Sequence, residues 1–92
     1  MLILTVSYKL KDGKRDEFIE RLLNEKIAEQ TQAEDGCIRY EYFMPVGKED
    51  ELFLLEVWEN REKQQAHLQS GHMKTMQQFK GDYVQSTELS QL

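Results

Sequence analysis

The segment 51–58, with the sequence ELFLLEVW, limits the possible folds of this chain more than any other stretch. In a β-strand successive side chains point to opposite faces, and here both alternating sets are largely apolar: Phe53, Leu55 and Val57 on one face, and Leu52, Leu54, Glu56 and Trp58 on the other. A strand that is apolar on both faces must be covered on both. With 92 residues, 39% of them hydrophobic, the chain has enough material for one small core. We therefore expect a single domain over residues 1–92, with a second subunit covering the other sheet face.

Hydrophobic period and turn residues divide the rest of the chain into strands and helices. Apolar, β-branched and aromatic residues predict strands at 2–8, 37–44, 51–58 and, more weakly, 83–89. Apolar residues at helical spacing predict a helix over 14–33, a short helix from an N-cap at Asn60 to about Gln69, and a further helical segment carrying Met73, Met76 and Phe79. The order βαββαβ is typical of the α+β ferredoxin-like fold, a four-stranded antiparallel sheet with its helices on one face.

The charge of the chain narrows its range of partners. Twelve Lys and Arg against seventeen Asp and Glu give a formal net charge of −5, and the basic residues are scattered. Phosphate recognition needs clustered cations, so we expect neither nucleic acid nor an anionic membrane as a partner. No apolar run approaches the roughly 20 residues that span a bilayer, and the first residues lack the features of a signal peptide. A single cysteine fits a reducing compartment, and we expect a cytoplasmic protein.

The two histidines, His67 and His72, are the side chains whose ordinary pKa lies nearest neutrality. They lie five residues apart across a Ser-Gly pair, and this break leaves their relative direction open. Metal-binding pairs on helices use spacings of three or four, and no cysteine cluster or HExxH motif is present, so we expect no metal site. Phosphate-binding loops and nucleotide fingerprints are also absent. Any catalysis must therefore use few groups and no large cofactor.

Other candidate residues lie on the predicted strands. Glu56 shares a face with Trp58, and removal from water would raise the pKa of this carboxyl. The alternative is that Glu56 pairs with Arg39 or a lysine across the sheet, and that Trp58 belongs to the core. Tyr40 likewise either faces a pocket or fills the core. Alternation places Tyr40 with Ile38, Tyr42 and Met44, and opposite Cys37, Arg39, Glu41 and Phe43. Cys37 has no cationic surroundings, and we expect it to be structural.

Four blocks of sequence carry a family resemblance: EDGC at 34–37, RYE at 39–41, LEVWEN at 55–60 and AHLQSGHM at 66–73. In order and spacing they resemble the antibiotic biosynthesis monooxygenase domain over nearly the whole chain, and the last third is especially similar to quinol monooxygenases of bacteria. The resemblance implies a ferredoxin-like protomer that dimerises through its sheets into an α/β barrel. The same protomer fold is indicated by the strand pattern.

Members of that family oxidise polycyclic phenols or hydroquinones with O₂, without flavin, haem or metal. The resemblance thus implies a homodimeric, cofactor-independent monooxygenase that acts on a small aromatic hydroquinone or phenol. It makes His67, at the family's AH position, or His72 the candidate base. Glu56 would orient an imidazole or a substrate hydroxyl. Three further side chains would wall an aromatic site: Trp58, Tyr40 and Met76.

The same resemblance leaves other functions open. Haem-degrading relatives use an Asn, Trp and His set, but here His67 stands at the position like their Trp, so haem degradation is disfavoured. A similar branch, of the isomerase class, processes a phosphorylated sugar-derived signal. That chemistry would need a cation at the pocket mouth, supplied by Arg39, Arg61, Lys63 or Lys74. The third interpretation is a non-catalytic dimeric protein that binds a ligand. Domain membership indicates fold more securely than reaction.

Overall fold

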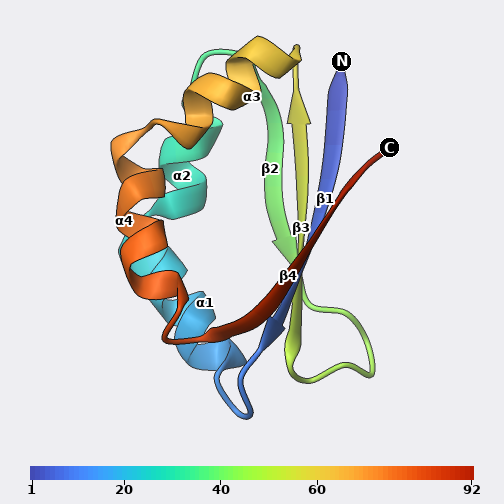
Figure 1. Ribbon diagram of the computed structural model, residues 1–92, viewed down its shortest axis with the longest axis vertical. Helices are drawn as coiled ribbons and strands as arrows, with labels where there is room; N and C mark the ends of the chain where they lie inside the picture. The colour runs from blue at the N-terminus through green and yellow to red at the C-terminus, as the bar shows by residue number, and fades with distance from the viewer.

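The computed structural model describes all 92 residues and places them in four strands and four helices. In chain order these are β1 (Leu2–Leu10), α1 (Arg15–Asn24), α2 (Ile27–Gln32), β2 (Cys37–Phe43), β3 (Glu51–Trp58), α3 (Arg61–Leu68), α4 (Gly71–Lys80) and β4 (Val84–Gln91). The four strands form one sheet in the order β2-β3-β1-β4, with every neighbouring pair antiparallel. All the helices lie on one face of this sheet (Figure 1). The predicted ferredoxin-like α+β fold is confirmed.

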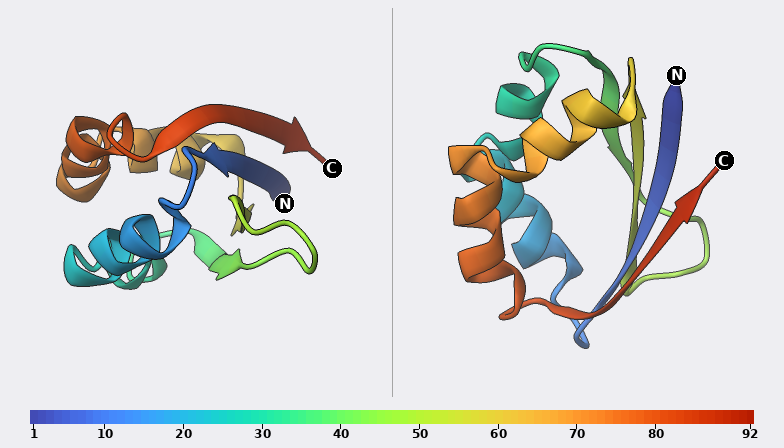
Figure 2. Two further views of the ribbon diagram at one scale, coloured as in Figure 1. Left: turned by 90° about the horizontal axis from the view of Figure 1, so that it is seen from below. Right: turned by 45° about the horizontal axis from the view of Figure 1, so that its top comes forward.

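The sheet and the helices form two layers, which the view from below and the tilted view separate clearly (Figure 2). The helix-facing residues of β3 are Leu52, Leu54, Glu56 and Trp58, all of which are buried. They pair with the helix-facing residues of β1, from Tyr8 opposite Leu52 to Leu2 opposite Trp58. The apolar strand 51–58 therefore lies in the interior of the sheet, as its sequence requires.

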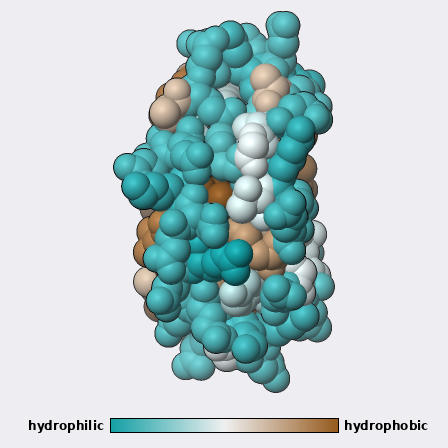
Figure 3. Space-filling model, turned by 90° about the vertical axis from the view of Figure 1, so that its left-hand side faces the viewer, coloured by the Kyte–Doolittle hydropathy of each residue, from teal (hydrophilic) through white to brown (hydrophobic).

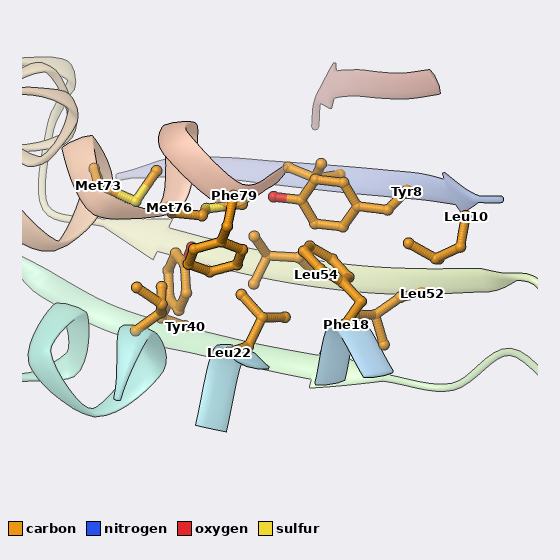
Figure 4. Close-up of a cluster of buried hydrophobic side chains, with 12 residues drawn as sticks. Tyr8, Leu10, Phe18, Leu22, Tyr40, Leu52, Leu54, Met73, Met76 and Phe79 are labelled. Atoms are coloured by element: carbon orange, nitrogen blue, oxygen red, sulfur yellow. The ribbon is translucent and has the colours of Figure 1, made fainter. Parts of the chain in front are cut away.

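The main core lies between this sheet face and helices α1, α2 and α4 (Figure 4). Its twelve buried residues are Val6, Tyr8, Leu10, Phe18, Leu22, Ile27, Tyr40, Leu52, Leu54, Met73, Met76 and Phe79. A second, smaller cluster of Leu2, Leu4 and Trp58 occupies the other end of the sheet. That end lies beside α3 and the start of α4, where the candidate site is found.

The predicted continuous helix over residues 14–33 is wrong, because the chain breaks between α1 and α2. Lys26 adopts a left-handed conformation with φ of 54°, which a regular helix does not allow. The change of direction brings Ile27 completely into the core and lets α2 pack against β2 and α4. The hydrophobic spacing continues through the break, so the pattern alone does not reveal it. The result is that the end of α2 points toward the α3–α4 junction.

The alternation predicted for the second strand is also interrupted. The pairing register between β2 and β3 shifts between Cys37 and Arg39, as in a β-bulge. Cys37 therefore packs against the core clusters, while Ile38 is 49% exposed. From Arg39 onward the expected alternation holds, and Tyr40 is buried on the helix-facing side.

The opposite face of the sheet has no helix over it (Figure 1). Phe53 and Leu55 of β3 are only half-buried there, beside the buried Val57. The edge strand β4, which pairs with β1, is exposed along most of its length. None of the four helices combines the length and the apolar character that a membrane crossing needs.

Candidate functional site

Three polar side chains from separate segments converge at the end of the helical layer. Glu34 lies in the turn after α2, His67 in the last turn of α3, and His72 in the first turn of α4. His67 Nδ1 is 2.6 Å from Glu34 Oε2, and His72 Nε2 is 2.9 Å from the same oxygen. One carboxylate oxygen thus bridges both histidines of the chain. We call these three residues the Glu34 cluster.

The helix boundaries explain how both histidines reach one carboxylate. Asn60 caps α3, because its side chain accepts a hydrogen bond from the Lys63 backbone N–H, and this confirms the predicted N-cap. Ser70 caps α4 in the same way, through the Met73 N–H. The chain turns between α3 and α4, so the two imidazoles approach each other, with ring centres 5.9 Å apart. The two imidazoles, whose relative direction the sequence left open, therefore point toward the same carboxylate.

The contacts of the Glu34 cluster favour one arrangement of the ring protons. An ionised carboxylate only accepts hydrogen bonds, so His67 donates its Nδ1–H and His72 donates its Nε2–H to Glu34. A neutral imidazole carries one N–H, so His67 Nε2 retains a lone pair. Nε2 makes no hydrogen bond within the chain. This nitrogen is the free acceptor of the cluster.

His67 is surrounded by aromatic rings. Its ring centre lies 4.9 Å from that of Trp58, with the planes tilted by 37°, and 5.6 Å from that of Tyr40 in an edge arrangement. His67 is only 1% exposed. Three of the residues predicted for the site, His67, Trp58 and Tyr40, are therefore in one group. Burial raises the pKa of Tyr40 well above its usual value, so its hydroxyl remains protonated at neutral pH.

Glu56 contacts this group through Trp58. The Trp58 indole Nε1–H donates to Glu56 Oε1 at 3.1 Å. Burial raises the pKa of the Glu56 carboxyl, although this hydrogen bond and the nearby His67 oppose the shift. Arg39 pairs instead with Glu41, so the alternative pairing of Glu56 with Arg39 is not found. Glu34, and not Glu56, makes the carboxylate contacts with both imidazoles.

Glu34 is the residue that the sequence interpretation missed. It belongs to the EDGC block that carried the resemblance, but its 33-residue separation from His67 hides the contact. The following Gly36 has a φ of +85° and accepts a backbone hydrogen bond from Glu59, which brings the turn close to the start of α3. The only sequence feature that could have pointed to Glu34 as a site residue was its position next to a glycine turn.

Met76, predicted at the site, and Cys37, predicted to be structural, both lie outside the Glu34 cluster. Met76 is buried in the main core cluster that also contains Tyr40. Cys37 packs near the site, and burial raises the pKa of its thiol to about 11, with Glu34 and Glu56 adding to the shift. A thiol of that pKa is a poor nucleophile at neutral pH, which agrees with a structural role.

The surface has four hollows, and none of them is lined by Trp58, Tyr40 or Met76. One hollow, of about 440 Å³, reaches the Glu34 cluster, and its lining is polar: Glu25, Gln30, Gly71, His72 and Thr75. These residues place it between α2 and α4. The helical side of the molecule is largely hydrophilic, and a few hydrophobic residues are visible near its middle (Figure 3).

Three of the four cations considered for a phosphorylated substrate already have partners within the chain. Arg39 pairs with Glu41, Lys63 with Asp35, and Arg61 donates to the Gln91 side chain. Lys74 lies on α4 and takes part in none of the ion pairs of the chain. No cationic cluster adjoins the histidines.

Comparison with known proteins gives a consistent assignment. The family profile described as antibiotic biosynthesis monooxygenase matches residues 1–78. A Bacillus subtilis protein named "Putative monooxygenase YcnE" is 28% identical over 89 residues, which cover 97% of this chain and 85% of that protein. A crystal structure of SO0527 from Shewanella oneidensis has a TM-score of 0.89 at 21% identity, over 99% of this chain and 87% of the other. A conserved Methanosarcina mazei protein has a TM-score of 0.84 at 26% identity, over 100% and 92%.

Proposed function

We propose, since the chain belongs to the antibiotic biosynthesis monooxygenase family, that it oxidises a small aromatic hydroquinone or phenol with O₂ and needs no organic cofactor. The observation that carries this proposal is the buried His67 imidazole. Glu34 fixes its orientation, Trp58 packs beside it with a tilted ring, and its Nε2 is left free. This arrangement supports a base in a dry aromatic environment, which the reaction requires.

The first step is a proton transfer. His67 Nε2 accepts a proton from a hydroxyl of the bound substrate and becomes an imidazolium. Glu34 then stabilises the positive charge through the Nδ1–H that it already accepts at 2.6 Å. Neutral hydroquinones react slowly with triplet O₂, whereas the anion is electron-rich enough to donate an electron. The protein therefore accelerates the reaction by making and holding the anion.

The oxidation then proceeds between the substrate and O₂. For a hydroquinone, one oxygen atom enters the ring as a new hydroxyl or carbonyl group, and the other leaves as water. The four electrons that reduce O₂ come from the substrate, which becomes a hydroxyquinone. The balance is one hydroquinone and one O₂ for one hydroxyquinone and one water, so no external reductant is needed.

Substrate access requires movement of side chains. His67 is enclosed in the free chain, and no hollow reaches Trp58 or Tyr40. We propose that the substrate enters beside Trp58, so that Trp58 and Tyr40 contact its ring while Met76 lies deeper. Glu56, held by the Trp58 indole, would then accept a hydrogen bond from the second substrate hydroxyl.

We also propose that the protein is a homodimer. Phe53, Leu55 and Val57 lie on the sheet face that has no helix over it. Two protomers that stack these faces would remove the half-buried apolar side chains from water. The resulting assembly is the α/β barrel that the sequence resemblance implied.

The direct test is O₂ consumption with a panel of hydroquinones in chelator-treated buffer, corrected for the uncatalysed rate. We expect saturable consumption with at least one member. With ¹⁸O₂, we expect one labelled oxygen in the product and one in water, and no accumulation of hydrogen peroxide. Inertness toward the whole panel, combined with isomerisation of a phosphorylated ketose, would instead support the isomerase. Inertness with ligand binding alone would support the non-catalytic interpretation.

A further inference from the structure

We propose that Glu34, His67 and His72 form a binding site for a divalent first-row metal ion, with Zn²⁺ as the best fit. We further infer that the bound ion inhibits the oxidation by occupying His67. The second statement rests on the proposed function, whereas the first does not. The spacing of the histidines argued against a metal site, but the third ligand comes from a distant turn.

The donor set is the first argument. Two imidazole nitrogens and one carboxylate oxygen are a common ligand set for Zn²⁺ sites that keep an open position. The candidate ligand atoms of the Glu34 cluster all lie within 4.8 Å of one another. The chain has only two histidines, and both are in this cluster. The cluster therefore gathers every imidazole of the chain around one carboxylate.

The distances provide the second argument. Zinc ligands at about 2.0–2.1 Å for nitrogen and 2.0–2.2 Å for oxygen are roughly 3.3 Å apart in a tetrahedron. The present separations from Glu34 Oε2 are 2.6 Å to His67 and 2.9 Å to His72. Each of these two pairs must open by only several tenths of an ångström, and the two imidazole nitrogens lie within 4.8 Å of each other. His72, 10% exposed, and the Glu34 side chain, 20% exposed, have room to move.

The surroundings leave a fourth position open. The polar hollow of about 440 Å³ borders His72, so water can reach an ion in the cluster. Ser70 Oγ lies 3.3 Å from His72 Nε2 and is a further oxygen that could serve as a metal ligand. Three protein ligands and an open position define a site with an entry path from solvent.

Metal binding would change the chemistry of His67. In the arrangement that the contact with Glu34 favours, the proton of the neutral ring is on Nδ1 and Nε2 has the lone pair. A metal at Nδ1 needs that nitrogen's lone pair, so the proton of the neutral ring moves to Nε2. No proton is lost from the ring, but Nε2 becomes a donor and can no longer accept a proton from the substrate. Zn²⁺ and the proposed base function are therefore mutually exclusive.

Binding is tested with untagged, chelator-treated protein titrated with Zn²⁺. We expect a one-to-one complex by calorimetry, and shifts of the ring nitrogens of both histidines together in ¹⁵N NMR spectra. Replacing a ligand in His72→Gln or Glu34→Gln should weaken binding by more than about 100-fold, beyond the 10- to 100-fold typical of an outer-shell change. Both substitutions are at partly exposed side chains, so the fold should persist.

Two control variants keep the Glu34 cluster intact. Asp35→Asn removes the neighbouring exposed carboxylate, which pairs with Lys63, and Cys37→Ser removes the only thiol. Both should bind Zn²⁺ as the natural chain does. Three results would each overturn the proposed site. These are no Zn²⁺ binding by the natural chain, loss of the binding in Cys37→Ser, and binding by His72→Gln that is as tight as that of the natural chain.

Inhibition by Zn²⁺ is tested separately, with the hydroquinone that the protein oxidises fastest. Zn²⁺ at concentrations that saturate the calorimetric site should abolish catalysed O₂ consumption, and a chelator should restore it. Mg²⁺, which prefers oxygen ligands, should have no effect. Zn²⁺ binding with full activity would overturn the inhibition but not the site. If no substrate is oxidised, the proposed function fails, while calorimetry and NMR still decide the metal site.

Discussion

At the scale of single residues, the buried carboxyl of Glu56 links stability to pH. Burial raises its pKa above the usual 4.5, although the Trp58 N–H donates to it. Between the unfolded and the folded pKa, the folded state binds more protons than the unfolded state. The free energy of unfolding contributed by Glu56 therefore falls as the pH rises through this interval. Above the folded pKa the full penalty for burying the charge remains.

Glu56→Gln should accordingly increase the free energy of unfolding at neutral pH. Glutamine has the same shape, and its amide oxygen still accepts from Trp58, but it carries no charge. Urea denaturation of both proteins from about pH 4 to about pH 8 should show a gain that grows with pH and disappears below the ordinary glutamate pKa. Glu41→Gln is the control, because the Arg39 partner lowers the pKa of Glu41, and its substitution should cause a small loss. A Glu56→Gln variant that is less stable at neutral pH would contradict this explanation.

Glu34 has a different role, the orientation of the base. Glu34→Gln keeps an oxygen that accepts the His67 Nδ1–H but removes the negative charge that stabilises the imidazolium. We expect kcat for hydroquinone oxidation to fall by about 10²-fold, the lower end of the usual contribution of a positioned base. Asp35→Asn is the control: it removes a neighbouring exposed carboxylate and should retain the natural rate. Equal rates in Glu34→Gln and the natural protein would rule out this role.

At the scale of elements, the contact between the turn at Gly36 and helix α3 positions the site. A Cβ on Gly36 would lie 2.6 Å from Lys63 Cβ, and the backbone φ of +85° already disfavours a side chain. Gly13, with φ of +73°, has open space around it. Gly13→Ala should therefore lower the free energy of unfolding only by the conformational cost of about 1–2 kcal/mol. Gly36→Ala should lower it clearly more. Urea denaturation measures both losses. Equal losses would show that α3 does not pack closely on this turn.

Much of this architecture could be predicted from the sequence, because it depends on local pattern. The strand Glu51–Trp58 and the cap at Asn60 were located to the residue, since alternation and capping are local effects. The break at Lys26 and the bulge after Cys37 could not be predicted, because tertiary packing determines both. The contact of Glu34 with His67 was hidden for the same reason. Which side chains meet across distant turns depends on the packed helices.

At the scale of the whole molecule, the uncovered sheet face predicts a dimer. Leu55 lies near the middle of that face, and Leu55→Lys would place a charge in the proposed interface at a high desolvation cost. We expect the natural protein to sediment as a dimer at micromolar concentration and Leu55→Lys to shift toward the monomer. Leu68→Lys, on helix α3 and 43% exposed, is the control and should remain dimeric. A natural protein that is a stable monomer would contradict the proposed assembly.

The central claim is that His67 is the base of a hydroquinone oxidation, and one comparison tests it most directly. The rate of O₂ consumption, corrected for the uncatalysed reaction, is measured for the natural protein and for His67→Gln in chelator-treated buffer. Glutamine can still donate a hydrogen bond to Glu34 but cannot accept a proton at neutral pH, and circular dichroism confirms that the variant is folded. We expect the rate to fall by about 10²- to 10⁴-fold. An unchanged corrected rate in a folded His67→Gln variant would contradict the claim.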